Sequence, residues 1–461
     1  MKLWSYVKEK MLANSNQTVC EGKAKMTFED IVILAETISK QISEYPCCAI
    51  LCASEMMASI SLLGCFAAET TAIPISSRYG DNHCKKVIDT ISPAAIITDA
   101  GGKLKVLRIS DFEYITPEEH PALIMCTSGT TGTPKGVMLS EENILTNVKD
   151  ICSYFELNQK DSILISRPLY HSAVLTGEFL VSLINGVQIN FFSESFNPIK
   201  IIDLISTCKI TTICGTPTQL GLLSHFAKNA EVCSLRNICI SGEHTSPDNA
   251  KRIRTSFPGA KIYHVYGLTE ACPRVSYLPP ELFQEHSCSV GVPLKSVEIK
   301  VLKDNSEVTK NNEIGILWVK GNNMMLGYYN NPELTLKVLK DGWLCTGDLA
   351  FIDSYGLLHI KGRNDELIIR GGMNIYPQEI ETELKKDMRT HDVVAYGYQD
   401  NHHGTLIGLR ISGDFADVDE VRKLCLARLP LYQVPKIIDL MKELPKNGSG
   451  KLIRGNLNER I

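Results

Sequence analysis

The stretch of this chain with the clearest chemistry is a run of hydroxyls and glycines that ends with a lysine. Its sequence is Thr127-Ser128-Gly129-Thr130-Thr131-Gly132-Thr133-Pro134-Lys135-Gly136-Val137. Glycines allow backbone conformations that other residues avoid, so consecutive N–H groups can turn toward one anion. The hydroxyls add hydrogen-bond donors, and Lys135 adds a positive charge. Because the run follows an apolar, strand-like segment at 122–126, we interpret it as a phosphate-binding loop.

Two other kinds of phosphate loop do not fit this run. A Walker A loop needs a lysine followed by serine or threonine, whereas Lys135 is followed by Gly136. The GxGxxG spacing of a dinucleotide fold is also missing. A solvated polar linker is the remaining alternative. The density of donors directly after a buried-looking strand disfavours it.

The run resembles the phosphate loop of the adenylate-forming superfamily, which includes acyl-CoA synthetases, luciferases and the adenylation domains of peptide synthetases. Three further segments match in the family's order. They are Tyr266-Gly267-Leu268-Thr269-Glu270, then Gly347-Asp348 with Gly362-Arg363, then Gly448-Ser449-Gly450-Lys451. The resemblance extends from about residue 27 to the C-terminus. The chain is therefore identified as a member of this superfamily, and its substrate stays open.

The resemblance implies how ATP is bound. Donors to the β- and γ-phosphates would come from Thr127, Ser128, Gly129, Thr130, Thr131, Gly132 and Lys135. Glu270 would be the magnesium ligand, and Thr269 beside it would contact the α-phosphate. One carboxylate together with substrate phosphates is a usual way for a protein to hold Mg²⁺. These groups would neutralise charge while a carboxylate attacks the α-phosphorus and pyrophosphate leaves.

The same resemblance assigns the nucleoside contacts. Tyr266, followed by Gly267, would stack on adenine, and the Gly242-Glu243 turn would approach the same ring. The family usually has Gly-Gly or Gly-Ala at that turn, so Glu243 and the His244 after it are departures. Asp348 would accept hydrogen bonds from both ribose hydroxyls, and Arg363 would contact the ribose. A structural salt bridge is the alternative role for Arg363.

Two half-reactions on one chain require two geometries. In the family, a small C-terminal domain rotates about a hinge, which Asp365 occupies here. Lys451 would enter the cleft for adenylation; its GSGK segment is not a P-loop, because Leu452 lacks the hydroxyl. The segment 370–377, with Gly371 and Gly372, would line the pantetheine tunnel after rotation. An ordinary turn before a helix is the alternative for that segment.

The acid is expected near Pro168-Leu169-Tyr170-His171, which resembles a signature of acyl- and aryl-CoA ligases. The resemblance places His171 near the reacting carboxylate; a packed or surface histidine is the alternative. Amino-acid-activating domains hold the amino group with an aspartate, and residues 166–180 contain none. Amino acids are therefore disfavoured, and we expect an aryl or fatty acid. Arg274 could pair with a second carboxylate on the substrate.

Three functions remain open. The leading hypothesis is a ligase that makes an acyl-adenylate from ATP and passes the acyl group to coenzyme A. The alternative acceptor is the phosphopantetheine of an acyl carrier protein. The third reading is a catalytically silent adenylate-binding protein. It is disfavoured by the joint presence of Lys135, Glu270, Asp348, Arg363 and Lys451. No carrier segment follows in the sequence, so we expect a stand-alone enzyme.

Composition excludes several other classes. A net charge of −4 gives no electrostatic reason to bind nucleic acid or an anionic membrane. The 16 cysteines include no CxxC pair and often lie in apolar runs, which indicates buried, reduced thiols and not zinc or disulfides. The apolar stretch 47–75 contains Glu55 and Glu69, so it is not a membrane span. No signal peptide is visible, and we expect a cytoplasmic protein.

The pattern of elements predicts an α/β protein. Residues 27–45 form an amphipathic helical stripe with Thr27 and Asp30 as a cap. Strand-like runs then alternate with helical stretches up to about Pro293, which predicts parallel sheets covered by helices. After Pro293, short strands suggest a small β-barrel-like subdomain. We expect an N-terminal adenylation core at 1–363 and a small mobile α+β lid domain at 364–461.

Overall fold

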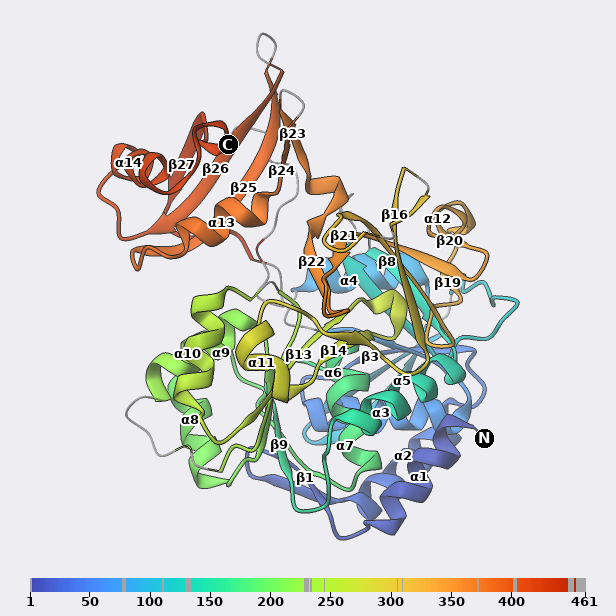
Figure 1. Ribbon diagram of the computed structural model, residues 1–461. Coiled ribbons are helices and arrows are strands. Elements are labelled where there is room, and N and C mark those ends of the chain that lie inside the picture. Colours follow the sequence, from blue (N-terminus) through green and yellow to red (C-terminus); the bar gives the residue numbers. More distant parts are fainter. Residues whose placement is uncertain are drawn as a thin grey trace. The chain divides into compact units, whose positions relative to one another are not determined.

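The computed structural model describes residues 2–76, 80–109, 112–128, 134–227, 232, 234–243, 245–304, 306–308, 310–370, 373–400, 404–446 and 452 (Figure 1). The chain forms two compact units. Unit 1 comprises Met1–Ile299 with Trp318–Cys345, and unit 2 comprises Lys300–Leu317 with Thr346–Ile461. Strands β18 (Gly315–Gly321) and β21 (Trp343–Ile352) each run across the boundary between the units in sequence.

The first sheet of unit 1 has nine strands in the order β15-β14-β13-β12-β11-β9-β10-β1-β2. The central strands β13-β12-β11-β9-β10-β1 are parallel to one another. Strands β2, β14 and β15 are antiparallel to their neighbours. Their bounds are β1 (Thr18–Glu21), β2 (Ala24–Thr27), β9 (Ser162–Ile165), β10 (Gln188–Phe191), β11 (Thr212–Gly215), β12 (Asn237–Ile240), β13 (Lys261–Gly267), β14 (Arg274–Leu278) and β15 (Val292–Pro293). The predicted parallel sheet is confirmed.

The second sheet of unit 1 has seven strands in the order β19-β8-β7-β4-β3-β5-β6. Its centre, β7-β4-β3-β5, is parallel, and hairpins extend it on both sides. The bounds are β3 (Cys47–Leu51), β4 (Thr71–Pro74), β5 (Ala95–Ala100), β6 (Lys103–Arg108), β7 (Leu123–Ser128), β8 (Pro134–Leu139) and β19 (Gly327–Tyr328).

Local capping chemistry explains where the helices of unit 1 begin. Helix α2 (Phe28–Ile42) starts with the predicted capping box of Thr27 and Asp30, and its buried stripe confirms the helix. Ser54 caps α3 (Glu55–Ala68), which contacts strands of both sheets. The remaining helices are α1 (Leu3–Ala13), α4 (Asp81–Ile91), α5 (Glu141–Tyr154), α6 (Ser172–Val174), the π-helix η2 (Leu175–Leu180), α7 (Val181–Ile184), α8 (Pro198–Thr207), α9 (Pro217–Ala227), α10 (Pro247–Ser256), α11 (Phe283–His286) and α12 (Pro332–Val338).

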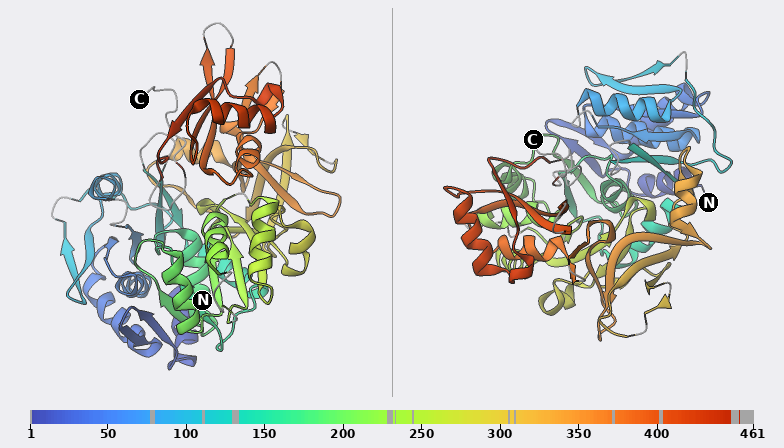
Figure 2. Two further views of the ribbon diagram at one scale, coloured as in Figure 1. Left: turned by 90° about the vertical axis from the view of Figure 1, so that its left-hand side faces the viewer. Right: turned by 90° about the horizontal axis from the view of Figure 1, so that it is seen from above.

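Unit 2 combines hairpins with a small α+β core. Pairs β16–β17, β21–β22 and β23–β24 are antiparallel, and β25–β26–β27 form a three-stranded sheet. The bounds are β16 (Val297–Lys303), β17 (Ser306–Glu307), β22 (Leu358–Arg363), β23 (Ile368–Arg370), β24 (Met373–Ile375), β25 (Thr390–Asp400), β26 (Gly404–Gly413), β27 (Ile437–Met441), α13 (Pro377–Leu384) and α14 (Val418–Arg428). Strands β25 and β26 and helix α14 contribute apolar side chains to one core. This part of the chain is drawn in orange to red in Figure 2.

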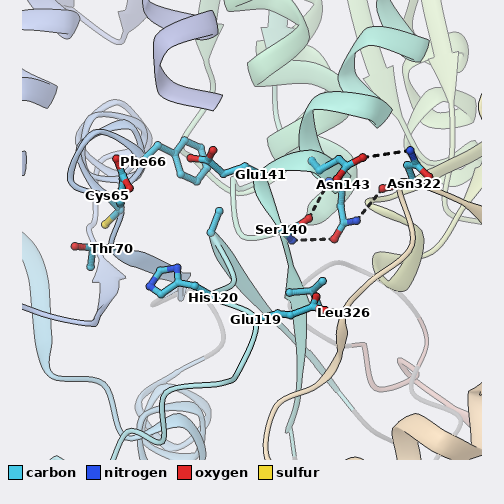
Figure 3. A pocket seen from close by; sticks show the side chains of 13 residues that line it. Cys65, Phe66, Thr70, Glu119, His120, Ser140, Glu141, Asn143, Asn322 and Leu326 are labelled. Atoms are coloured by element: carbon cyan, nitrogen blue, oxygen red, sulfur yellow. Dashed lines mark hydrogen bonds between the residues drawn. The ribbon is translucent and has the colours of Figure 1, made fainter. Parts of the chain in front are cut away.

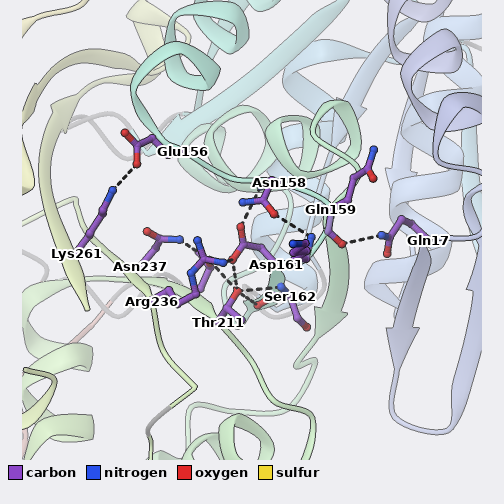
Figure 4. Close-up of polar contacts among 12 residues, drawn as sticks. Gln17, Glu156, Asn158, Gln159, Asp161, Ser162, Thr211, Arg236, Asn237 and Lys261 are labelled. Atoms are coloured by element: carbon purple, nitrogen blue, oxygen red, sulfur yellow. Dashed lines mark hydrogen bonds and ion pairs between the residues drawn. The ribbon is translucent and has the colours of Figure 1, made fainter. Parts of the chain in front are cut away.

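A buried carboxylate organises the amino ends of the parallel strands in the nine-stranded sheet (Figure 4). Asp161 precedes β9 and accepts hydrogen bonds from Asn158 N at 3.0 Å and Thr211 Oγ1 at 2.8 Å. It also pairs with Arg236 Nη1 at 3.4 Å, and Thr211 and Arg236 precede β11 and β12. The amino ends of these strands are therefore held by structural contacts. In open α/β sheets, ligands bind at the other ends of the strands, beyond their carboxyl ends.

Two expectations from composition can be compared with the structure. The apolar stretch 47–75 forms β3, α3 and β4, and most residues of α3 are buried. Among the described helices, none has the length and apolar character that crossing a membrane requires. The cysteines in the described part of the chain are free thiols, and Cys126, Cys214 and Cys239 lie in strands as predicted.

Candidate active site

The predicted phosphate loop lies between two antiparallel strands. In the register of β7 and β8, Thr127 faces Lys135 and Ser128 faces Pro134. The hairpin therefore brings the lysine at its end next to the hydroxyl at its beginning. Four of the predicted phosphate contacts at the tip lie outside the described residues: Gly129, Thr130, Thr131 and Gly132.

A tyrosine that sequence reasoning did not single out connects this hairpin to the predicted magnesium ligand. Tyr328 pairs with Val137 of β8, and the Lys135 Nζ atom lies 5.9 Å from the centre of its ring. The Tyr328 hydroxyl donates a hydrogen bond to Glu270 Oε1 at 2.8 Å. Tyr328 thus contacts the predicted phosphate-binding Lys135 through its ring and the predicted metal ligand Glu270 through its hydroxyl.

The segment that carries Thr269 and Glu270 contacts the predicted acid-binding segment. Thr269 Oγ1 and Ser172 Oγ are hydrogen-bonded at 3.1 Å, and Ser172 directly follows His171. Thr176 Oγ1 donates to the carbonyl oxygens of Ser172 at 2.9 Å and Cys272 at 3.1 Å. His171 occupies the N-cap of α6. The structure therefore brings together three of the predicted segments: the hairpin, the Tyr266–Glu270 segment and the segment ending at His171.

Two buried amides, also missed by sequence reasoning, fix the backbone after Glu270. Asn147 of α5 accepts from Arg274 N at 3.2 Å and donates to Arg274 O at 2.8 Å. Asn323 Nδ2 donates to Ala271 O at 2.7 Å and to Arg274 O at 3.1 Å. In addition, Met325 N donates to Glu270 O at 2.8 Å. The Thr269–Glu270 turn is therefore held from α5 on one side and from residues 323–325 on the other.

The predicted adenine contacts lie at the carboxyl ends of β12 and β13. Gly242 follows β12 with φ at 92°, a left-handed conformation that suits glycine. Glu243 accepts a hydrogen bond from Thr218 Oγ1 at 2.7 Å. Tyr266 and Gly267 end β13, and a side chain at Gly267 would collide with the Pro273 carbonyl. Gly267 therefore has a structural reason to be glycine, and its contact with nucleotide stays a prediction.

The predicted ribose pair lies in unit 2. Asp348 and Arg363 are register partners on β21 and β22, and Arg363 Nη1 lies 3.3 Å from Asp348 Oδ1. Arg363 also donates to Thr346 O at 2.8 Å and pairs with Asp365 Oδ1 at 3.2 Å. The salt bridge considered from sequence is present. Because the Arg363 side chain remains 44% exposed, this pairing leaves part of the guanidinium accessible.

The remaining predicted residues of unit 2 cannot be placed. Gly371, Gly372 and Lys451 lie outside the described residues, as does His244 of unit 1. The described strands β23 and β24 flank the glycines, and Arg370 Nη1 donates to Tyr432 O at 3.0 Å. The roles of Gly371 and Gly372 at the pantetheine tunnel and of Lys451 in adenylation stay predictions.

A cavity of about 530 Å³ in unit 1 lies away from these residues (Figure 3). Its carboxylates, Glu69, Glu119, Glu141 and Glu142, would repel phosphate groups. None of the predicted site residues that the structure describes lines it. Size alone therefore does not identify the nucleotide site in this molecule.

Comparison with known proteins decides which family this arrangement represents. The model of the family "AMP-binding enzyme" matches residues 27–329. The chain belongs to this family. A long-chain-fatty-acid–CoA ligase of Bacillus subtilis is 34% identical over 75% of the chain and 62% of its own length. A feruloyl-CoA synthase of an Amycolatopsis species is 30% identical over 87% of the chain and 86% of its own length. The chain thus spans less than two thirds of the first relative and most of the second.

Solved structures agree with the family assignment. The o-succinylbenzoate coenzyme A synthetase of Bacillus subtilis, in complex with ATP and a magnesium ion, superposes with a TM-score of 0.86 at 25% identity. The match covers 98% of this AMP-binding enzyme and 99% of the synthetase. The predicted membership of the adenylate-forming superfamily and the mixed α/β fold are confirmed.

Proposed function

We propose that this AMP-binding enzyme is a carboxylate–coenzyme A ligase. It activates an acid with ATP to an acyl-adenylate, releases pyrophosphate, and passes the acyl group to the thiol of coenzyme A with release of AMP. The observation that carries the proposal is the contact chain from Lys135 through Tyr328 to Glu270. Thr269, which precedes Glu270, is hydrogen-bonded to Ser172, which follows His171. This bond extends the contacts to the predicted acid-binding segment.

The residues present suit magnesium held together with a nucleotide. Among the described residues, no group of three or more His, Cys, Asp or Glu side chains could hold a metal by itself. Glu270 as one carboxylate fits Mg²⁺, which takes its other ligands from phosphates and water. Bound there, the ion would neutralise charge on the phosphates. Lys135 and the hairpin N–H groups would bind the same phosphates from the other side of Tyr328.

The acid class follows from the segment at His171. Relatives are named for fatty acids, ferulate and 2-succinylbenzoate, which are carboxylic acids without an α-amino group. The segment 166–180 of this chain likewise lacks the aspartate that would hold an amino group. Coenzyme A is the proposed thiol, since these relatives are CoA ligases by name. The free thiols of the described cysteines suit a reducing compartment and support a cytoplasmic location.

The test is acid-dependent exchange of pyrophosphate into ATP, measured over a panel of aliphatic, aromatic and dicarboxylic acids. We expect exchange that needs both an acid and Mg²⁺, and thioester formation that also needs coenzyme A. A holo carrier protein in place of coenzyme A separates the two acceptors, because a carrier-specific enzyme would ignore the free thiol. If the protein binds ATP but none of the acids supports pyrophosphate exchange, the proposal is contradicted.

A further inference from the structure

A carboxylate outside the proposed site holds the middle of the predicted acid-binding segment. The backbone N–H of Leu169, two residues before His171, donates a hydrogen bond to Glu55 Oε2 at 3.1 Å. Leu169 is only 3% exposed, so its N–H needs a partner within the protein. Glu55 is the first residue of α3 and lies 114 residues away in the chain. The contact therefore joins the acid-binding segment to a helix that carries none of the predicted site residues.

The backbone of Glu55 is itself held in place by a second carboxylate. Glu21, the last residue of β1, accepts hydrogen bonds from Glu55 N at 3.0 Å and from Met56 N at 3.1 Å. The hydroxyls of Ser54 and Ser193 also donate to Glu21. The amino end of α3 is thereby attached to the carboxyl end of a strand in the nine-stranded sheet.

The seven-stranded sheet provides the other support of this helix end. Asp99 of β5 accepts hydrogen bonds from Ala53 N at 2.7 Å and from Ser54 N at 3.2 Å. Helix α3 also contacts β3 and β4, and β4 pairs with β7, the first strand of the phosphate hairpin. Glu55 therefore connects the acid-binding segment to the sheet that carries the predicted phosphate loop.

Side-chain packing leaves room for the acid-binding segment to shift. A cavity of about 20 Å³, enough for about one water molecule, lies against Leu169 and Tyr170. Its other walls include Glu55 and apolar side chains of β3, α3 and β4. Because side chains do not fill this space, packing alone does not fix the segment. The hydrogen bond from Leu169 to Glu55 opposes a shift into it.

The place of this segment matters for the first half-reaction of the proposed function. The acid carboxylate must approach the α-phosphorus to a reacting distance of about 3–3.5 Å. The acid is assigned to the segment ending at His171, and the phosphates are assigned to the hairpin. A displacement of about 1 Å between reacting groups can cost about 10²-fold in rate even when both substrates are bound.

We propose that Glu55 is a positioning residue for adenylation. Its hydrogen bond to Leu169 N sets the place of the acid carboxylate relative to the ATP phosphates, and its side chain acts through that segment without touching either substrate. The inference rests on the proposed function, because it assigns the acid to the segment ending at His171. Loss of the hydrogen bond should therefore impair the reaction of the acid and leave ATP binding unchanged.

Three substitutions of Glu55 separate the hydrogen bond from charge and length. Glu55→Met keeps the length and removes the acceptor, so we expect kcat/KM for the acid in pyrophosphate exchange to fall by about 10–10²-fold. Glu55→Gln keeps an acceptor oxygen at the same reach without the charge, and its kcat/KM should stay within about fivefold of wild type. Glu55→Asp keeps the charge but is too short to reach Leu169 N, and we expect a loss of about tenfold or more.

ATP binding and stability distinguish positioning from a general structural role. Calorimetry should give the same dissociation constant for ATP in wild type and in Glu55→Met. Ser54→Ala is the matched control, because it removes the side-chain cap of the same helix and leaves Glu55 present. In urea titrations, Ser54→Ala should be less stable than wild type, while its kcat/KM for the acid stays at the wild-type value.

Several results would overturn the inference. Glu55→Met could keep the acid kcat/KM of Ser54→Ala, its ATP binding could weaken together with that kcat/KM, or Glu55→Gln could be as impaired as Glu55→Met. If Glu55→Met does not fold, Glu55→Asp decides, and wild-type activity in that variant contradicts the need for the hydrogen bond. Failure of the proposed function is a different result, because the wild-type enzyme then supports exchange with no acid.

Discussion

At the scale of single residues, Tyr328 joins the two halves of the proposed phosphate site, since its ring lies beside Lys135 and its hydroxyl binds Glu270. Tyr328→Phe removes the hydrogen bond to Glu270 and retains the ring beside Lys135. A hydrogen bond to a charged group contributes about 1.5–3 kcal/mol. We therefore expect kcat/KM for ATP to fall by about tenfold or more, and the Mg²⁺ concentration for half-maximal activity to rise. Initial rates over a Mg²⁺ titration measure both effects.

The neighbouring tyrosine provides a matched control. Tyr329 accepts a hydrogen bond from Ile115 N at 2.9 Å and stacks on Tyr114, and neither partner belongs to the proposed site. Tyr329→Phe should lower the free energy of unfolding by about 0.5–1.5 kcal/mol and leave the Mg²⁺ dependence as in wild type. If both phenylalanine variants shift the Mg²⁺ curve equally, Tyr328 has no special link to the metal site.

The predicted metal ligand can be tested by removing its charge alone. Glu270→Gln keeps the size of the side chain and can still interact with Tyr328. We expect a loss of about 10²-fold or more in acid-dependent exchange, since charge stabilisation at the phosphates is lost. ATP binding followed by calorimetry at high and at zero Mg²⁺ should show a large metal effect in wild type and a small one in the variant. An unaltered metal effect would remove Glu270 from the proposed metal site.

What the sequence could predict at this scale depended on separation along the chain. The phosphate-binding loop could be predicted because its glycines, hydroxyls and lysine are contiguous in sequence. Tyr328 and Glu270 are 58 residues apart, and Asn147 meets Arg274 across 127 residues. Tyrosine and asparagine have many ordinary roles, so their types alone gave no signal. Arg274 was noticed because of its proximity to Glu270 in sequence, but its buried hydrogen-bond partner Tyr154 was not.

At the scale of elements, the turn at 269–271 depends on the buried amides of Asn147 and Asn323. Asn147→Leu leaves the N–H and carbonyl of Arg274 without this partner. Each buried group left unsatisfied costs about 1–3 kcal/mol, so we expect a clear loss of unfolding free energy in urea titrations. Because the turn carries Thr269 and Glu270, kcat should also fall, even at temperatures where the variant is fully folded.

The amide exchange rates of the turn separate a local effect from a global one. In Asn147→Leu, we expect faster hydrogen exchange at 268–274 than in the strands of the seven-stranded sheet. An equal change everywhere would mean that Asn147 contributes only to general stability. A variant with full kcat and lower stability would lead to the same conclusion.

Element types were predictable where the local pattern was strong. Ser162–Ile165 and Asn237–Ile240 are among the strand-like runs before Pro293 that form strands, because short apolar runs at those positions have no helical period. The order of strands in the two sheets depends on crossovers that periodicity does not encode. The helical stretch from 172 to 184 is divided into α6, the π-helix η2 and α7, a division that the apolar pattern does not encode. The contact of Arg274 with Gly177 in η2 is a tertiary feature that no local pattern reveals.

At the scale of the whole molecule, the proposed function requires two half-reactions to share one set of residues. The first places a carboxylate against ATP, and the second places a thiol against the acyl-adenylate. The proposed lid domain at 364–461 would supply different side chains in the two steps. Apolar side chains of α13, α14 and the three-stranded sheet share one core, as a domain that moves as one body requires.

Separate assays of the two half-reactions test this division through Lys451. Lys451→Ala should lower acyl-adenylate formation by about 10²–10³-fold, the usual effect of losing one charge-stabilising donor. It should spare thioester formation when the acyl-adenylate is supplied. Lys446→Ala is the matched control, because Lys446 Nζ is already paired with Asp392 Oδ2 at 2.7 Å within unit 2. Equal losses in both half-reactions for Lys451→Ala, or the same defect in Lys446→Ala, would mean that Lys451 does not act specifically in adenylation.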